Sequence, residues 1–366
     1  MSKDRVFKGM WVTLIVLTGL SLFCGCKQEG NGPANAANKP KLFMSLPDYI
    51  NTPDGMTLDP DTGNIILAAP NFNDANAPGL LMQIDPQNKL TKYIDMPLHP
   101  TTGYGCPMGL DFGPDGHLYV ADNQYFYDKD HASRLMRVTV ENGKPTGVEV
   151  VVDGFKLSNA VIWKGDTVFV SDTFMDLPDT PGLSAVYKFS LTELNQGPVH
   201  LKPLGTDPHL IAKFVTTPNH REDVGGADGL TLDSNGNLYV ASFGDGKIHK
   251  LTFDTQGDVA EQSVFVDLPK ELPCSDGLFC DLTTDEIYVA DSEQNAIHVI
   301  SSSDGSLKTL WMNDDTDGAD GGLDQPCESL IRGNELIIVN FDMPFPGLKN
   351  AAFDKPYTMS VIQLKK

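Results

Sequence analysis

The sequence predicts an all-β fold, a six-bladed β-propeller with four-stranded blades. Its clearest unit runs from Ala227 to Ser242, where two short apolar segments flank a polar turn, Asp233 to Asn237. Asn and Gly adopt positive φ at little cost, and Leu, Tyr and Val favour extended strands, so this segment indicates a β-hairpin. The hairpin opens with Asp228, an acidic residue that precedes a glycine.

The same hairpin pattern recurs six times along the chain. Successive copies begin 54, 51, 69, 48 and 52 residues apart, and a period of this kind is typical of a repeat architecture. Each period has room for four short strands, which make one propeller blade. The first residues of the six copies are Asp54, Met108, Asn159, Asp228, Asp276 and Glu328.

The composition agrees with one closed β domain, predicted over residues 42–366. Of the 366 residues, 40% are hydrophobic, which is enough for a large core, and 34 Gly and 25 Pro can serve many turns. The apolar run Leu42–Leu46 precedes the first repeat, whereas the last repeat is followed by a single outer strand, Tyr357–Leu364. We therefore expect Leu42–Leu46 to complete blade six, so that the two chain ends pair and remove a sheet edge.

Residues 1–26 have the layout of a signal peptide. Lys3, Arg5 and Lys8 precede an apolar run that is too short to span a bilayer comfortably, and Cys24-Gly25-Cys26 follows. This end resembles a bacterial lipoprotein signal, which implies lipidation of Cys26; the alternative is an uncleaved anchor helix. Residues 27–41 are poor in large apolar side chains and predict a flexible tether. We expect a lipid-anchored protein of the bacterial cell envelope, periplasmic or on the outer surface, that contacts membrane only through its anchor.

The charge of the chain excludes one class of partner. The formal net charge is −22, and loss of residues 1–25, with three basic side chains and one acidic, changes it to −24. Such an acidic surface repels phosphate backbones, so we expect no nucleic-acid partner, and it favours cations.

Four cysteines, Cys106, Cys274, Cys280 and Cys327, remain after the signal peptide. An even number in an oxidising compartment is compatible with disulfides, and Cys274 and Cys327 hold similar positions in neighbouring repeats. Buried free thiols are the alternative, and we expect them by default.

The first strand of every propeller blade faces the central channel, so the six first residues predict a ring around the axis. Several carboxylates in a narrow channel cannot all stay ionised without compensation. Mixed carboxylate and amide oxygens suit a hard divalent cation such as Ca²⁺, which takes six to eight oxygen ligands. Alternatively, acidic residues before glycine cap the strand starts. The predicted metal ligands are Asp54, Asn159, Asp228, Asp276 and Glu328.

At Ser158-Asn159 and Ala227-Asp228-Gly229-Leu230 the chain resembles the senescence marker protein/gluconolactonase/luciferin-regenerating enzyme family. The resemblance implies a six-bladed propeller with a divalent cation, often calcium, held by Asp54, Asn159 and Asp228. It also implies lactone hydrolysis, with Asp228 as general base or nucleophile. The chain departs from the family at Asp54, where Glu is usual, and at Pro107-Met108, where sugar-lactone hydrolases carry Asn.

Two function classes follow for the channel. One is a calcium-dependent hydrolase of a lactone or other activated ester, in which the cation polarises the reacting oxygen of a small-molecule substrate. The other is a noncatalytic propeller that binds a ligand or a protein, because a fold alone implies no chemistry. The residues that close the second strands are predicted either to support the ring residues through hydrogen bonds or to cap turns: Asp122, Asp172, Asp291 and Asn340.

Two further features of the loops are open to more than one interpretation. Aromatic side chains in the loops after the inner hairpins, including Tyr125, Phe126 and Phe174, serve either core packing or substrate contact. The acidic segment from Asn313 to Asp324 partly matches an EF-hand loop but lacks the final Glu and flanking helices. It indicates either a solvated acidic turn or a calcium site.

Overall fold

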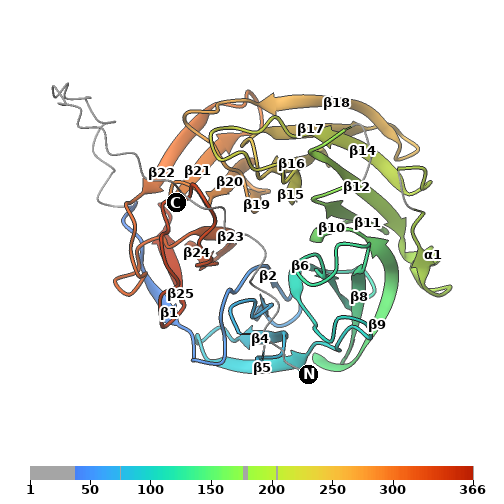
Figure 1. Cartoon of the computed structure of the whole chain (residues 1–366), viewed down its shortest axis with the longest axis horizontal. Helices are drawn as coiled ribbons and strands as arrows, with labels where there is room; N and C mark the ends of the chain where they lie inside the picture. Colours follow the sequence, from blue (N-terminus) through green and yellow to red (C-terminus); the bar gives the residue numbers. More distant parts are fainter. Residues whose placement is uncertain (1–37, 75, 176–179, 203–204, 366) are drawn as a thin grey trace, which may run out of the picture.

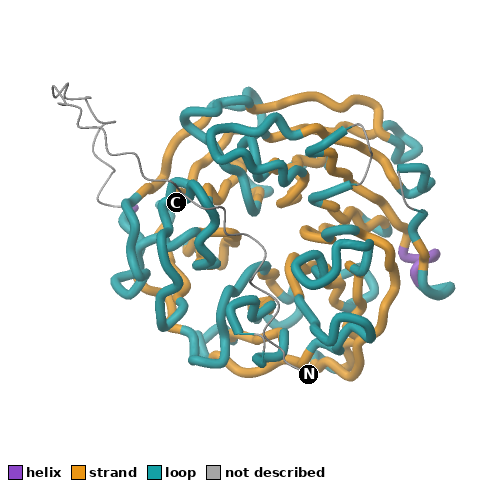
Figure 2. Tube along the Cα trace, viewed as in Figure 1, coloured by secondary structure: helices purple, strands orange, loops and turns teal. Residues whose placement is uncertain are grey.

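The computed structural model describes residues 38–74, 76–175, 180–202 and 205–365. The predicted signal peptide, the lipidation candidate Cys26 and most of the tether lie outside the described residues. Figure 1 shows six antiparallel sheets arranged radially around one axis, which confirms the six-bladed propeller. In the described residues the only α-helix is the single turn α1 (Leu191–Leu194), and Figure 2 shows strands and loops almost everywhere else.

The first three blades follow the chain order. Blade one contains β2 (Met56–Leu58), β3 (Ile65–Ala69), β4 (Leu80–Ile84) and β5 (Leu90–Asp95). Blade two contains β6 (Pro107–Phe112), β7 (Leu118–Asp122), β8 (Ser133–Glu141), β9 (Lys144–Phe155) and β13 (Val199–His200). Blade three contains β10 (Ser158–Lys164), β11 (Thr167–Asp172), β12 (Leu183–Ser190) and β14 (Leu210–Val215).

The remaining blades complete the circle. Blade four contains β15 (Ala227–Leu232), β16 (Leu238–Ser242), β17 (Ile248–Phe253) and β18 (Val259–Val266). Blade five contains β19 (Leu278–Asp281), β20 (Glu286–Asp291), β21 (Ala296–Ser301) and β22 (Leu307–Met312). Blade six contains β23 (Pro326–Arg332), β24 (Glu335–Asn340), β25 (Thr358–Gln363) and β1 (Lys41–Ser45).

The core lies between adjacent blades. The second strands, such as β7 and β16, are buried along their whole length, whereas outer strands such as β18 are mostly exposed or half-buried. An inner strand packs against a neighbouring blade on each face, so its residues form continuous apolar runs. The outer strand lies at the edge of its blade and faces water, so it has no such continuous buried run.

The glycine after the ring residue lets the blades approach closely at the channel. A Cβ on Gly229 would lie 2.3 Å from the carbonyl oxygen of Asp276, and one on Gly277 would lie 2.3 Å from that of Cys327. Neither distance is possible for a real Cβ atom, so only glycine fits at these two positions. The recurring acid–glycine pair therefore serves both the channel and the packing of the next blade.

Blade six is closed by the two ends of the propeller, as predicted. Strand β1 pairs antiparallel with β25, with Lys41 opposite Val361 and Ser45 opposite Thr358. Figure 1 shows β1 along the outer edge of this blade. The pairing removes the sheet edge that either terminus alone would leave open.

Blade two differs from the predicted four strands because it gains a fifth. After β12 the chain forms α1 and then β13, which pairs parallel with β9 at Val199 and Val152. This excursion covers the outer edge of blade two before the chain returns to β14. It also explains why the interval between the third and fourth repeats is the longest one.

The described cysteines form no disulfide. Cys106, Cys274, Cys280 and Cys327 are all free and buried, so a Cys274–Cys327 bridge is wrong and the default expectation of buried thiols is confirmed. Among the described residues, no helix has the length and apolarity needed to cross a membrane.

Candidate metal and substrate site

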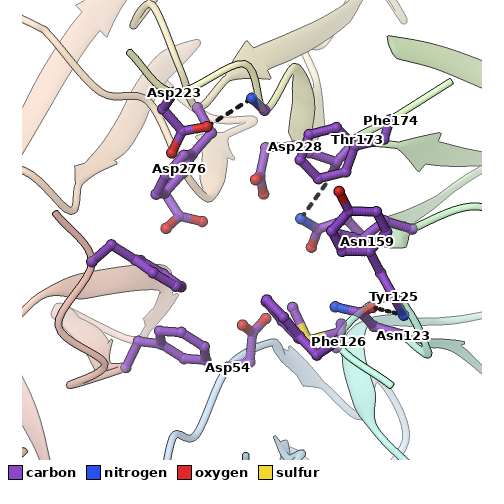
Figure 3. A pocket seen from close by; sticks show the side chains of 16 residues that line it. Asp54, Asn123, Tyr125, Phe126, Asn159, Thr173, Phe174, Asp223, Asp228 and Asp276 are labelled. Carbon is purple, nitrogen blue, oxygen red and sulfur yellow. Dashed lines mark hydrogen bonds between the residues drawn. The ribbon is translucent and has the colours of Figure 1, made fainter. Parts of the chain in front are cut away.

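A central cavity of about 190 Å³ opens where the second strands end. Figure 3 shows its lining, in which side chains from the first strands meet side chains from the loops above them. Four predicted ligands contribute to it, each from a different blade: Asp54, Asn159, Asp228 and Asp276. The structure thus brings together residues that are up to 222 positions apart in the sequence (54 to 276).

The carboxyl groups of Asp54, Asp228 and Asp276 point toward the same space (Figure 3). Glu328, the fifth predicted ligand, lines a second cavity of about 340 Å³ further along the first strands, and its carboxylate accepts the N–H of Ser329 at 2.8 Å. Burial raises the pKa of Glu328 well above its usual value, and Glu328 in turn contributes to raising the pKa of Asp228. Of the five predicted ligands, four therefore face one cavity and Glu328 lies beside it.

The ring carboxylates are strongly perturbed. Burial raises the pKa of Asp54 well above its usual value, and the neighbouring Asp276 raises it further. Burial also raises the pKa of Asp228, to which Asp276, Asp54 and Glu328 add repulsion. The pKa of Asp276 is raised by burial to about 7, although a hydrogen bond from Ser292 opposes the shift. Burial is the main cause for all three; neighbouring carboxylates add repulsion at Asp54 and Asp228, whereas the positive charge of Arg221 lowers the pKa of Asp276.

Asn159 presents an oxygen to the cavity. Its side-chain Nδ2 donates to Thr173 Oγ1 at 3.2 Å, and Thr173 in turn donates to the carbonyl oxygen of Ala227 at 2.9 Å. Because the hydroxyl proton of Thr173 is used by Ala227, Oγ1 acts as acceptor toward Asn159. The amide is therefore oriented with Oδ1 toward the carboxylates, as Figure 3 shows.

The residue that follows the second strand supports the ring in blade five as well. Ser292 donates its hydroxyl to Asp276 Oδ2 at 2.6 Å. Ser292 and Thr173 occupy equivalent positions, directly after Asp291 and Asp172. In both blades the hydroxyl that contacts the ring residue thus belongs to the residue directly after the aspartate that ends the second strand. Sequence analysis did not single out these two hydroxyls.

Blade two lacks this pair of a polar ring residue and a supporting hydroxyl. Its ring residue, Met108, offers no hydrogen bond, and the equivalent residue after the second strand is Asn123. Asn123 Oδ1 accepts the N–H of Tyr125 at 2.9 Å, which fixes the amide, while its fully buried Nδ2 has no hydrogen-bond partner. Asn123 lines the central cavity, so this unpartnered donor is available to a bound ligand.

Asp223 is a cavity residue that sequence analysis missed. It lies in the loop between β14 and β15, where its Oδ1 accepts the N–H of Gly225 at 2.8 Å. Arg221, whose side chain is 1% exposed, lies 3.5 Å from Asp223 and 2.8 Å from Glu293. The only feature of the sequence that could have pointed to this loop as part of the cavity is its length.

The upper wall of the cavity is aromatic. Tyr125 and Phe174 stack with ring centroids 4.6 Å apart, and Phe126 packs edge-on against Phe72 at 4.9 Å. Phe243, Phe341 and Phe345 complete the lining from blades four and six. The predicted contact role of Tyr125, Phe126 and Phe174 is therefore compatible with their position, and the wall suits an apolar ligand group.

The four residues that close the second strands hold backbone rather than ring side chains. Asp122 accepts the N–H of Cys106 at 2.6 Å, and Asp172 accepts that of Leu157 at 2.7 Å. Asn340 accepts the N–H of Asp324 at 3.2 Å, whereas Asp291 accepts that of Glu293 at 3.0 Å. Three of the four thus fix the chain just before the first strand of their own blade. They therefore support the ring residues indirectly, by fixing the backbone that leads into the first strand.

The donor set fits a hard divalent cation. Three carboxylates and one amide oxygen face the same cavity, and the amide is oriented with its oxygen inward. Burial raises the pKa values of the three carboxylates, and repulsion between the carboxylates raises those of Asp54 and Asp228 further. None of the described residues that line the cavity is a His, Cys, Lys or Arg, which disfavours zinc.

The comparisons with known proteins agree with this description. Residues 110–261 match the model of the SMP-30/Gluconolactonase/LRE-like region. The matched stretch runs from β6 to β18 and includes Asn159 and Asp228. No protein of curated function matches the chain in sequence.

Solved structures share the fold over most of the chain. A luciferin-regenerating enzyme superposes with a TM-score of 0.60 at 13% identity, covering 90% of this chain and 97% of its own. A gluconolactonase from Xanthomonas campestris gives 0.55 at 13% identity, with 93% and 100% covered. A calcium-binding regucalcin from Agrobacterium tumefaciens gives 0.54 at 13% identity, with 90% and 96% covered.

At these identities the structural likeness establishes the fold, and the family match adds the region that contains two of the cavity oxygens. The resemblance found in the sequence is therefore confirmed: the chain is a six-bladed β-propeller that carries an SMP-30/gluconolactonase/LRE-like region across blades two to four.

Proposed function

We propose that the protein is a divalent-cation-dependent hydrolase, of the lactonase type, that acts on a lactone or another activated ester in the central cavity. The observation that carries this proposal is that Asp54, Asn159, Asp228 and Asp276 line one aromatic-walled cavity, with the three carboxyl groups pointing toward the same space. Calcium is the proposed ion, because all four donors are oxygens. The match to the SMP-30/gluconolactonase/LRE-like model supports the same reaction class.

The four oxygens would hold the cation, with Glu328 adding negative charge from the side. A bound divalent cation polarises a carbonyl or phosphoryl oxygen and stabilises the negative charge that develops there. Asp228 is 7% exposed and borders the cavity, so it can contact a substrate held there. Its role is to take a proton from the attacking water or to attack the ester carbon itself.

The remaining lining defines the kind of substrate. Asn123 Nδ2 can donate a hydrogen bond to a substrate oxygen, because its own oxygen is already used by Tyr125. The aromatic wall favours an alkyl or aryl group over a polyhydroxylated sugar, which would leave hydroxyl groups unpaired against the rings. Met108, in the ring position of blade two, adds another apolar surface. An apolar lactone or aryl ester is therefore the proposed substrate class rather than an aldonolactone.

The cellular setting is part of the proposal. The segment Cys24-Gly25-Cys26 and the polar residues after it support a lipid anchor followed by a tether. The enzyme would then face the periplasm or the outer surface of a bacterium, and small molecules would reach the cavity from that compartment. The acidic surface supports the absence of nucleic-acid partners.

The test is a substrate screen of the purified protein against alkyl and sugar lactones, aryl esters and phosphotriesters, with calcium and with a chelator. We expect calcium-dependent turnover that prefers apolar lactones or aryl esters. Asp228→Asn keeps the size but removes one carboxylate, so we expect turnover to fall at least about 100-fold and calcium affinity at least about tenfold.

The noncatalytic alternative makes a different prediction. A propeller that only binds a ligand or a protein would bind calcium and show no turnover of any substrate class in the screen. Turnover that a chelator leaves unchanged, or an Asp228→Asn variant with wild-type activity, would contradict the proposed mechanism.

A further inference from the structure

Three carboxyl groups meet outside the central cavity, between the two long loops of blade six. Asp324 ends the loop before β23, while Asp342 and Asp354 belong to the loop between β24 and β25. One carboxylate oxygen from each of the three lies within 4.8 Å of the other two. None of the three lines the central cavity, so this cluster is separate from the site described above.

The cluster contains a buried polar atom with no partner. Asp324 is 2% exposed, and its Oδ1 has no hydrogen-bond partner among the described residues. Its backbone N–H is held by Asn340 Oδ1 at 3.2 Å, which fixes the residue in place. A buried carboxylate oxygen without a donor is costly, and in native proteins such an atom indicates an ion or water that completes it.

The other two carboxylates are held in position by the loop. Asp342 accepts Asn350 Nδ2 at 2.9 Å with one oxygen and the N–H of Asp354 at 2.8 Å with the other. Each carboxylate oxygen has a second lone pair, so both remain able to bind a cation. In the described part of the chain no Lys, Arg or His forms a salt bridge with any of the three.

The local charge is strongly negative. Burial raises the pKa of Asp324 to about 8, and Asp342, Asp354, Asp315 and Asp317 raise it by repulsion. Burial likewise raises the pKa of Asp342 to about 7. Four other carboxylates thus add to the negative potential at the buried Asp324.

We propose that Asp324, Asp342 and Asp354 form a second divalent-cation site, suited to calcium, that ties the two long loops of blade six together. Carboxylate oxygens alone are the donors that calcium prefers, and the absence of His and Cys from the cluster disfavours zinc. Calcium accepts six to eight oxygens, so backbone carbonyls or water complete the shell.

The location of this site differs from the calcium site that the sequence suggested. The segment from Asn313 to Asp324 contributes only its last residue, whereas the other ligands come from a loop about 20 to 30 residues further along the chain. A linear motif therefore does not describe the site. The site is formed instead by two loops that meet in space.

The second site has a structural consequence for the central cavity. Phe341 and Phe345, which line that cavity, lie on the same loop as Asp342 and Asp354. A cation that binds Asp324 on one loop and Asp342 on the other would hold the aromatic wall in place. The second site does not depend on the proposed hydrolase activity.

The test counts bound calcium in the full chain, purified in detergent, with calcium alone as the probe. We expect Asp324→Asn to bind one calcium ion fewer per chain than the wild type. Asp320→Asn is the matched control, because it removes the same charge from the same loop at a side chain that is 68% exposed and outside the cluster. This control variant should bind as much calcium as the wild type.

A double variant separates the two sites. In the Asp228→Asn background, which weakens only the central site, adding Asp324→Asn should remove one further calcium ion per chain. If the central cavity binds no calcium, the wild type should still bind one ion that Asp324→Asn removes. The number of calcium ions bound per chain therefore distinguishes failure of the proposed function from failure of the second site.

Thermal melting provides the second measurement and guards against misfolding. In chelator, Asp324→Asn should melt at or above the wild-type temperature, because Asn removes a buried, repelled carboxylate. In calcium it should gain less stability than the wild type, and the partly exposed Asp354→Asn should behave likewise. Unchanged calcium counts and unchanged calcium stabilisation in both variants would overturn the second site.

Discussion

Asn159 Nδ2 donates to Thr173 Oγ1 at 3.2 Å, and this bond decides which end of the amide faces the channel. Thr173 is an acceptor here because its own proton goes to the carbonyl oxygen of Ala227. With the amide nitrogen used, Asn159 Oδ1 is directed toward Asp54, Asp228 and Asp276 (Figure 3). One hydroxyl, on the residue directly after β11, thus orients an oxygen ligand.

Thr173→Val tests this orientation. Valine has the same shape but no hydroxyl, so the amide of Asn159 loses its fixed direction and the cation loses a positioned ligand. We expect calcium affinity at the central site to fall about 10- to 100-fold, as is common when a residue that orients a ligand is removed. Calorimetric titration with calcium measures the change.

Thr231→Val is the matched control for this experiment. Thr231 is also buried, and its hydroxyl accepts the N–H of Cys280 at 3.0 Å, away from the central cavity. The control should lose some stability and keep its calcium affinity. Equal losses of affinity in both variants would mean that Thr173 acts through general stability alone.

Asn123→Ser tests the role of the unpartnered amide. Serine keeps an oxygen that can accept the N–H of Tyr125, but it cannot extend an amide N–H into the cavity. Loss of one neutral hydrogen bond to the substrate costs about 0.5–1.5 kcal/mol, so kcat/KM should fall about 2- to 12-fold. Calcium affinity should stay unchanged, and a variant that loses calcium while keeping kcat/KM would place Asn123 at the cation instead.

The pH dependence of stability reports the ring carboxylates in the absence of calcium. Burial raises the pKa of Asp276 to about 7, whereas an Asp in an unfolded chain titrates near about 4. Between these values the folded protein holds a proton that the unfolded chain has released. Stability contributed by this proton is therefore present at low pH and is lost as the pH rises toward 7.

Asp276→Asn removes this contribution, so we expect its melting temperature in chelator to fall less between pH 5 and pH 7 than that of the wild type. His249, whose pKa burial lowers to about 4, acts in the opposite direction in both proteins and cancels in the comparison. Calcium should reverse the wild-type trend, because the cation competes with the protons and binds better as the pH rises. Melting curves at several pH values, with calcium and with chelator, measure both effects. A wild-type slope equal to that of the variant would refute the shift at Asp276.

Cys26→Ser tests the proposed anchor. The thiol of Cys26 is the predicted acceptor of lipid, so the variant should move from the membrane fraction to the soluble fraction of the cell. Fractionation and labelling with a radioactive fatty acid measure the change. Cys24→Ser is the matched control and should keep the label. Loss of the label in that variant alone would instead place the lipidation site at Cys24.

The sequence by itself determined the repeat, because the signals for a hairpin are local. Alternating apolar residues and turn residues with positive φ, such as Gly236 at φ 74°, act over a few positions and recur in every blade. The acid–glycine pairs likewise predicted a ring at the channel. The predicted closure of blade six followed from counting strands, and β1 pairs with β25 as expected.

Only the tertiary structure decided which side chains share a cavity, because this depends on contacts between blades. The sequence treated Asp276 and Glu328 as equivalent, yet Asp276 faces the central cavity and Glu328 lines the second one. Asn123 became notable only when folding placed it in the lining of the central cavity without a hydrogen-bond partner for its Nδ2. The meeting of Asp324 with Asp342 and Asp354 arises because loops that are separated in the chain fold against each other, and no local pattern encodes that contact.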